Sequence, residues 1–207
     1  MHNLCGYAHG AAGAGHALIE LFAATGEARF RRAAEGAFAY ERSWIRGGAW
    51  PDLVGVARAA GRDVLVPAVA SWCHGAAGSA FARTRAARLV GRPDPDGEHA
   101  LAATRAFVTE QLARVPDDFS LCHGLAGAAD ALLYADGASD LAAEVGRHGI
   151  DCFHRPGRDF PSGLPAGQTA GLLRGLAGVG LFYLRLGDPS VTTALLISHL
   201  DRDSAQA

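Results

Sequence analysis

The stretch SWCHGAAG at residues 71–78 sets a cysteine and a histidine in front of a glycine-rich turn, and nearly the same string returns as LCHGLAG at 121–127. Two further copies of the pattern are AHGAAG at 8–13 and LRGLAG at 173–178. Successive copies lie far enough apart to hold a pair of helices and the loops between them. The sequence therefore contains an internal repeat of four units.

Each motif is followed by a segment with helical character. Residues 11–26 carry apolar side chains at helical spacing, and residues 175–187 are apolar on almost every side. The intervening segments 27–45, 98–115 and, more weakly, 138–149 are amphipathic. Helices that are apolar all round belong inside a packed assembly. The sequence thus predicts an all-α fold of repeated inner and outer helices, an α/α solenoid or toroid with four inner helices.

The composition limits the class of protein. A chain of 207 residues suits one domain, and its net charge of −2 argues against a nucleic-acid partner held through phosphates. All 19 basic residues are arginines, which together with the frequent Ala and Gly indicates a GC-rich bacterial genome. The sequence contains no apolar run long enough for a membrane span and no signal-peptide pattern at its start. Its four cysteines do not form a disulfide framework, so we expect reduced thiols in the cytoplasm.

Two long connections, 46–71 and 150–170, are rich in Gly and Pro. Connections of this length without helices of their own usually line a functional site. The best strand signal, DVLVPAVA at 63–70, is expected to be a loop that crosses the core. The C-terminal stretch 188–207 shows no clear pattern of an outer helix before its polar end.

The cysteines of the two central motifs can be interpreted in two ways. If the inner helices gather around one axis, their starts come together, and Cys73 lies close to Cys122 and His123. Two thiolates and one imidazole make a Cys₂His set, a catalytic zinc pattern whose fourth tetrahedral position is left for water or substrate. Helix N-terminal amides also favour thiolates. Alternatively, both cysteines are small buried apolar residues, as free cysteines often are. The spacing alone leaves both interpretations open.

Other polar residues near the motifs have weaker assignments. His9, His74 and Arg174 occupy corresponding positions in the repeat. His9 is a candidate general acid or base because imidazole titrates near neutral pH, although a histidine at a helix start can equally serve as a hydrogen-bonding group. The repeated motif glycines are predicted to allow close packing of the inner helices rather than to contact a ligand. Cys5 and Cys152 have no counterparts in the repeat and are predicted to be structural.

Taken together, the motifs resemble those of the lanthionine synthetase C-like cyclases. The resemblance is closest to the C-terminal cyclase domain of the bifunctional class II lanthipeptide synthetases. The segments that carry it follow the family's order over nearly the whole chain: NLCGYAHGAAG, AFAYERSWI with WPDL, SWCHGAAG, LCHGLAG and GLLRGLAGVGLFYLRLGDPSV. On this basis residues 1–207 are interpreted as the C-terminal portion of such a cyclase domain.

The resemblance implies a fold, a reaction and a set of site residues. The fold is a toroid of seven inner and seven outer helices. In the reaction, a cysteine of a dehydrated precursor peptide adds to dehydroalanine or dehydrobutyrine and forms a thioether ring. The cofactor is Zn²⁺, with Cys73, Cys122 and His123 as its ligands and the substrate thiol in the open position as a thiolate. By the same resemblance His9 is catalytic and handles the proton of the enolate, with His74 as a second catalytic candidate near the metal.

This sequence departs from the family pattern in three respects. Four of the seven inner helices are accounted for, so we expect an incomplete toroid that lacks its N-terminal cyclase and dehydratase portion and has little activity alone. His74 stands where stand-alone cyclases have tyrosine after the first zinc cysteine, and Val69 stands where they have arginine. The last two departures fit the class II type.

Two other functions compete with a peptide cyclase. The first is a non-catalytic zinc- or peptide-binding remnant or partner module, which acts only with a missing N-terminal half. The second is a glycosidase on a helical toroid. That function requires two catalytic carboxylates beside a sugar site, and the motif positions offer none.

Overall fold

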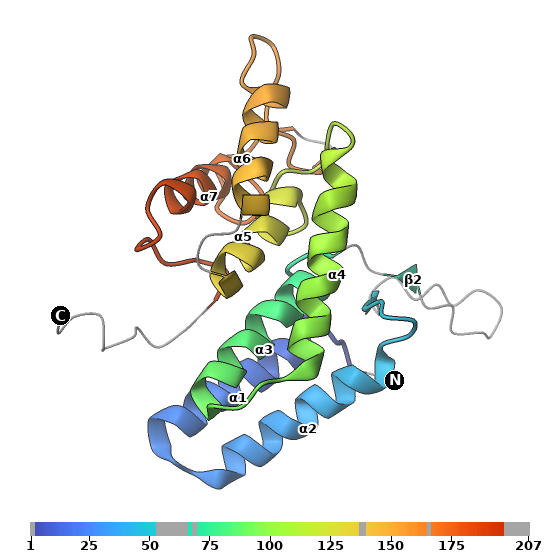
Figure 1. Ribbon diagram of the computed structural model, residues 1–207, viewed down its shortest axis with the longest axis vertical. Helices are drawn as coiled ribbons and strands as arrows, with labels where there is room; N and C mark the ends of the chain where they lie inside the picture. The colour runs from blue at the N-terminus through green and yellow to red at the C-terminus, as the bar shows by residue number, and fades with distance from the viewer. Residues whose placement is uncertain (1–2, 53–65, 68–69, 137–139, 165–166, 197–207) are drawn as a thin grey trace.

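The protein is described by a computed structural model (Figure 1). It describes residues 3–52, 66–67, 70–136, 140–164 and 167–196. Within these ranges there are seven α-helices: α1 (Ala11–Thr25), α2 (Ala28–Trp44), α3 (Ala76–Val90), α4 (Pro95–Leu112), α5 (Leu125–Asp136), α6 (Asp140–Phe153) and α7 (Leu176–Gly187). Two short strands, β1 (Pro51–Asp52) and β2 (Val66–Pro67), pair antiparallel with Pro51 opposite Pro67.

The helices form an arc of inner and outer layers. Along the inner layer, α1 contacts α3, α3 contacts α5 and α5 contacts α7, while α2, α4 and α6 each pack on the inner helix that precedes them in the chain. Figure 1 shows α1, α2 and α3 at one end of the molecule and α5, α6 and α7 at the other, with α4 running between the two groups. The predicted all-α fold of four inner helices is confirmed.

The motif glycines set both the start and the packing of the inner helices. Each inner helix begins one residue after the first glycine of its motif. At the second glycine, a Cβ would collide with the carbonyl oxygen of the residue six positions earlier, and this holds in all four motifs. The turn before each inner helix therefore lies directly against the helix itself, and only glycine fits there. The prediction that these glycines serve packing agrees with this geometry. The four are Gly13, Gly78, Gly127 and Gly178.

The three outer helices lie close to their predicted ranges, and the differences have local causes. Helix α4 begins three residues earlier than expected, because the Asp94 side chain accepts a hydrogen bond from the backbone N–H of Asp96 and Pro95 occupies the first turn. Helix α6 continues four residues beyond the predicted end, to Phe153, which is buried. Helix α2 turns Ala34 and Phe38 into the core.

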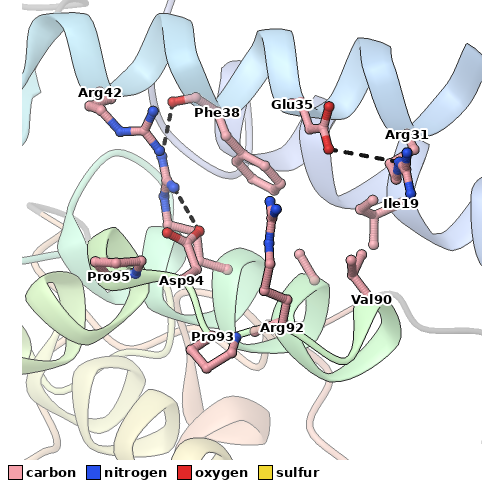
Figure 2. Close-up of a pocket in the computed structure, with 13 residues that line it drawn as sticks. Ile19, Arg31, Glu35, Phe38, Arg42, Val90, Arg92, Pro93, Asp94 and Pro95 are labelled. Atoms are coloured by element: carbon pink, nitrogen blue, oxygen red, sulfur yellow. Dashed lines mark hydrogen bonds and ion pairs between the residues drawn. The ribbon is translucent and has the colours of Figure 1, made fainter.

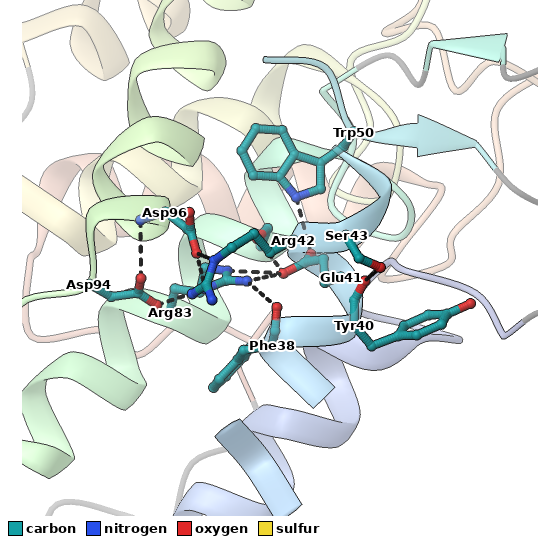
Figure 3. Close-up of polar contacts among 10 residues, drawn as sticks. Phe38, Tyr40, Glu41, Arg42, Ser43, Trp50, Arg83, Asp94 and Asp96 are labelled. Carbon is teal, nitrogen blue, oxygen red and sulfur yellow. Dashed lines mark hydrogen bonds and ion pairs between the residues drawn. The ribbon is translucent and has the colours of Figure 1, made fainter. Parts of the chain in front are cut away.

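A buried ion pair joins α2 to α3 (Figure 3). The side chains of Glu41 and Arg83 are both 0% exposed, and Arg83 Nε donates to Glu41 Oε2 at 2.9 Å. The same carboxylate accepts from Trp50 Nε1 at 3.1 Å and from Ser79 Oγ at 3.2 Å, while Arg83 Nη1 reaches Asp94 at 2.8 Å. Burial raises the pKa of Glu41, and Arg83 opposes that rise. This polar network therefore connects four segments: α2, the loop that follows it, α3 and the start of α4.

The connections differ in part from the sequence-based expectations. Most of the segment 63–70 lies outside the described residues, but Val66 and Pro67 form strand β2. The part of the C-terminal stretch that is described, 188–196, has no helix, as expected. It packs back on the core, because Leu195 is fully buried and its carbonyl accepts a hydrogen bond from Trp72 Nε1 at 2.8 Å. Among the described helices, none combines the length and apolar character that crossing a bilayer requires.

Candidate metal centre

Backbone hydrogen bonds join the four motif turns into a ladder. The backbone N–H of Ala8 donates to the carbonyl of Cys73 at 3.2 Å, and that of Trp72 donates to Cys122 at 3.1 Å. The N–H of Cys122 in turn donates to Leu173 at 2.8 Å. A backbone hydrogen bond thus joins each motif turn to the next, although the turns are distant in the sequence. This pairing brings the side chains at equivalent motif positions together.

The ladder gathers the three predicted ligands into one group. One ligand atom each from Cys73, Cys122 and His123 lies within 4.8 Å of the others. Cys73 Sγ is 3.2 Å from His123 Nε2. Both cysteines are buried and the histidine is half-buried. Burial agrees with the interpretation of Cys73 and Cys122 as small apolar residues, and their closeness to each other and to an imidazole agrees with a metal site.

The protonation of the group follows from these contacts. Its hydrogen bond with Cys122, followed by that with His123, holds the pKa of the Cys73 thiol far below its usual range, against the effect of burial. The pKa of Cys122 is raised by the same hydrogen bond and by burial. The pKa of His123 is raised, chiefly by its hydrogen bond with Cys73. The contacts within the group thus favour the thiolate form of Cys73 and the thiol form of Cys122.

The donor set fits a metal ion. Two thiolates and an imidazole are the ligands that softer divalent metals prefer. His123 Nε2, 3.2 Å from Cys73 Sγ, is the ring nitrogen that faces the thiols. Cys73, Cys122 and His123 can therefore hold a metal, which would replace the thiol proton.

The other predicted site residues lie beside this group. The ring centroids of His9 and His74 are 5.7 Å apart, and those of His74 and His123 are 6.4 Å apart. Three imidazoles therefore follow one another along three successive turns. His74 is half-buried and His9 is exposed, so a substrate can reach both. Both were singled out from the sequence as catalytic candidates, and the geometry leaves them in position for that role.

The two remaining cysteines stay apart from the group. Cys5 is buried, and burial raises the pKa of its thiol to about 12. Cys152 is partly buried with its sulfur 3.7 Å from His148 Nε2. All four cysteines, each within the described residues, are free thiols. The prediction that Cys5 and Cys152 are structural agrees with these positions.

Two cavities differ in their relation to the site. One, of about 990 Å³, is lined by His9 together with Tyr7, His16 and Trp72 and is mainly apolar. The other, of about 380 Å³, lies between α2 and the end of α3 (Figure 2). Its lining includes several arginines but no cysteine or histidine. Of the predicted site residues, His9 lines the first cavity, whereas His74 and the three residues of the metal group do not.

One polar cluster was not predicted. His16, for which no role is predicted, is buried with Nδ1 3.0 Å from Tyr7 Oη and Nε2 3.3 Å from Glu20. Arg85 Nε donates to Glu20 at 2.6 Å. Burial lowers the pKa of His16, and Glu20 opposes this. The spacing of His16 and Glu20, one helical turn apart, was the available signal.

An arc of α/α pairs with a Cys₂His group at its inner turns defines an α-helical repeat protein with a candidate metal centre. A family model described as lanthionine synthetase C-like protein matches residues 1–197. The chain belongs to this family. A search of curated proteins found no match. Membership of the family supports a cyclase function of the lanthionine synthetase type.

Proposed function

We propose that this protein is a zinc-dependent peptide cyclase of lanthipeptide biosynthesis, of the class II type, in the bacterial cytoplasm. Its substrate is a dehydrated precursor peptide that carries a cysteine and a dehydroalanine or dehydrobutyrine. The observation that carries the proposal is the convergence of Cys73, Cys122 and His123 within 4.8 Å in a chain of this family. Four free thiols are consistent with a reducing compartment.

Zinc suits the spacing of this group. Atoms bound tetrahedrally at about 2.0–2.3 Å from one Zn²⁺ lie about 3.3–3.8 Å from one another. The separation of 3.2 Å between Cys73 Sγ and His123 Nε2 is close to that range. When bound, zinc supplies an open fourth position in which a substrate thiol loses its proton near neutral pH.

The imidazoles supply the proton chemistry. In ring closure the substrate sulfur forms a bond to the β-carbon, the C=C π bond breaks, and its electron pair moves onto the adjacent carbonyl as an enolate. A proton then joins the α-carbon. His9 and His74 stand beside the metal group, and neutral imidazole can take up the thiol proton and return it to carbon. The reaction is an isomerisation and needs no co-reactant.

The test of this function begins with the metal. The purified chain is expected to contain about one zinc per molecule, as three protein ligands and one open position require. Cys122→Ala removes one thiolate and is expected to lower the zinc content to near zero, measured by mass spectrometry of the metal. Cys152→Ala, which removes a thiol outside the group, should retain the metal. Unchanged zinc in Cys122→Ala contradicts the assignment.

The structure also suggests where a partner docks. In α3, Ser79 and Arg83 contact Glu41 of the preceding outer helix. In α7, Tyr183, which corresponds to Arg83 in the repeat, donates to the carbonyl of Gly146 in the preceding outer helix α6. These positions, one and five residues after the second motif glycine, therefore pack against the pair before them.

The corresponding face of α1 is open. Ala14 is exposed where Ser79 is fully buried, Leu18 is half-buried where Arg83 is fully buried, and Leu21 is 45% exposed. We propose that an outer helix of a further α/α pair, from an N-terminal cyclase portion, covers this face. It would contact Ala14, Leu18 and Leu21 as Glu41 of α2 contacts Ser79 and Arg83 of α3.

Ring closure by the chain alone is accordingly expected to be slow. With a peptide that contains one dehydroalanine and one cysteine, we expect adding the N-terminal helix pairs of a class II cyclase to raise the rate about 100-fold, because an unsupported α1 misplaces His9. The measurement is the loss of thiols that react with N-ethylmaleimide, since ring closure leaves the mass unchanged.

A charge placed on the open face tests the docking site, and a charge placed elsewhere on the surface is the control. Leu21→Arg should abolish the stimulation, whereas Val115→Arg, an exposed position after α4, should not. Full activity without the added helices would show that the open face is no docking site.

The same open face favours one alternative function. A non-catalytic zinc- or peptide-binding module would also need a partner on α1. Such a module would bind zinc and the partner but form no ring when the two are combined, so the cyclisation assay separates the two functions.

A further inference from the structure

The fourth motif turn places an arginine where the other three have histidines. Arg174 corresponds in the repeat to His9, His74 and His123. The residue before it, Leu173, accepts the backbone hydrogen bond of Cys122 at 2.8 Å. The turn that carries Arg174 is therefore paired directly with the turn that carries two of the three metal-binding residues.

The guanidinium of Arg174 is only partly satisfied by hydrogen bonds within the described residues. Its Nη2 donates to the carbonyl of Gly163 at 3.2 Å, and its Nε is buried without a hydrogen-bond partner among the described residues. Within the same part of the chain it forms no ion pair, in contrast to Arg83 and Arg185, which pair with carboxylates. A half-buried cation with an unused donor is unfavourable unless another group completes its contacts.

The positive charge of Arg174 acts on the candidate metal group. The pKa of Cys122 is raised by Cys73 and by burial, and Arg174 works in the opposite direction. For His123, where the hydrogen bond with Cys73 raises the pKa most, Arg174 again opposes the rise. Asp118 acts on the pKa of both residues in the opposite direction to Arg174. The turn that carries Arg174 lies beside the group through the backbone hydrogen bond between Cys122 and Leu173.

We infer that Arg174 is a catalytic residue that binds the carbonyl oxygen of the dehydroamino acid during ring closure. This role rests on the proposed cyclase function. As the sulfur–carbon bond forms and the C=C π bond breaks, the electron pair moves through the α-carbon onto that oxygen. A guanidinium donates hydrogen bonds to an oxyanion in a fixed geometry and retains its proton throughout.

The equivalent motif positions then have two different functions, proton transfer by imidazoles and charge stabilisation by a guanidinium. An imidazole can take up and return a proton, so His9 and His74 can move the proton between sulfur and carbon. A guanidinium keeps its proton, so Arg174 stabilises charge instead. The acceptor oxygen would complete the contacts of the buried Nε.

A small thiol tests this role without turnover. In 3-mercaptopropionate the carboxylate oxygens are as many bonds from sulfur as the enolate oxygen is in the addition product. The amide 3-mercaptopropionamide has the same length but no charge. Binding of each to the full chain loaded with Co²⁺ is measured from the thiolate-to-cobalt absorption band. The unmodified chain should bind the carboxylate about 10- to 100-fold more tightly than the amide, the gain of a charge-assisted hydrogen bond.

Three variants of the chain make the result specific. Arg174→Gln should abolish the preference for the carboxylate while leaving the cobalt content and the affinity for the amide unchanged. Arg174→Lys should retain part of the preference. Arg158→Gln, at an exposed arginine of the preceding loop, should retain all of it. In a chain that closes rings, Arg174→Gln should also lower kcat about 100-fold with little change in KM.

The outcomes separate this inference from the proposed function. A preference that survives in Arg174→Gln overturns the role of Arg174, whether or not the chain closes rings. A preference that depends on Arg174 in a chain that closes no rings even with the N-terminal helix pairs added supports the oxyanion site and contradicts the cyclase. A chain that takes up no cobalt refutes both.

Discussion

Replacing Arg83 by methionine is expected to lower the free energy of unfolding by about 3–5 kcal/mol. Glu41 is fully buried, and the substitution leaves its carboxylate without the only cation that contacts it among the described residues. Denaturant unfolding followed by circular dichroism measures the change. The loss should appear as a lower midpoint with an unchanged slope.

Arg42→Met is the matched control for this variant. Arg42 also reaches Asp96 in the same cluster, at 2.5 Å, but its side chain is 55% exposed. An exposed pair contributes at most about 1 kcal/mol, so this variant should stay close to the unmodified chain. Equal losses in the two variants would show that the buried contact with Glu41 carries no special weight. Replacing Glu41 and Arg83 together by leucine and methionine should recover much of the loss.

Gly127→Ala is the second substitution with a large expected effect, a loss of about 3 kcal/mol or more, since inserting atoms into a packed region already costs about 1–3 kcal/mol where side chains can move. Here the new Cβ would meet the carbonyl oxygen of Leu121, which is backbone and cannot rotate away. Either α5 or the turn that carries Cys122 has to shift. Denaturant unfolding measures the stability, and zinc content shows whether the ligands moved.

Gly180→Ala provides the comparison within another inner helix. A Cβ at Gly180 meets nothing within 4 Å. Alanine should therefore stabilise α7 by about 0.5–1 kcal/mol, because it restricts the unfolded chain and favours the helix. If both substitutions destabilised the protein equally, the effect would belong to helical glycines in general and not to the close approach in the motif.

The sequence predicted the repeat well because each repeat unit is recognisable from residues close together in the chain. Each motif glycine is followed at once by an inner helix, and the outer helices follow the period of their apolar residues. Cys73 and Cys122 meet because the repeat implies that equivalent turns are neighbours. Both conclusions need only the pattern within each unit and the assumption that the units stack.

The interactions that the sequence did not reveal join residues far apart in the chain. Nothing near Glu41 indicates that it will be buried, because its partners Ser79 and Arg83 come from a later helix. The contact of Trp72 with Leu195 has the same character. The early start of α4 was missed for another reason, since the cap at Asp94 outweighed the weak apolar pattern of that helix.

For the site, the residues could be predicted from the sequence, but their contacts with one another could not. Arg174 is a recognisable repeat position, yet its contact with the carbonyl of Gly163 and its unpartnered Nε among the described residues emerge only from the packed structure. The cluster around His16 was overlooked because Arg85 approaches Glu20 from a different helix. The charge state and the pKa of a polar side chain depend on the groups around it, and tertiary contacts bring those groups together.

The ladder between the motif turns has a consequence for how this protein can change. The backbone hydrogen bonds that join one turn to the next involve no side-chain atom at positions 9, 74 or 174. An imidazole can be exchanged for a guanidinium or an amide there without disturbing the scaffold that supports the thiols. The motif turns thus form a common backbone scaffold, and single substitutions at these positions can introduce new reactivities.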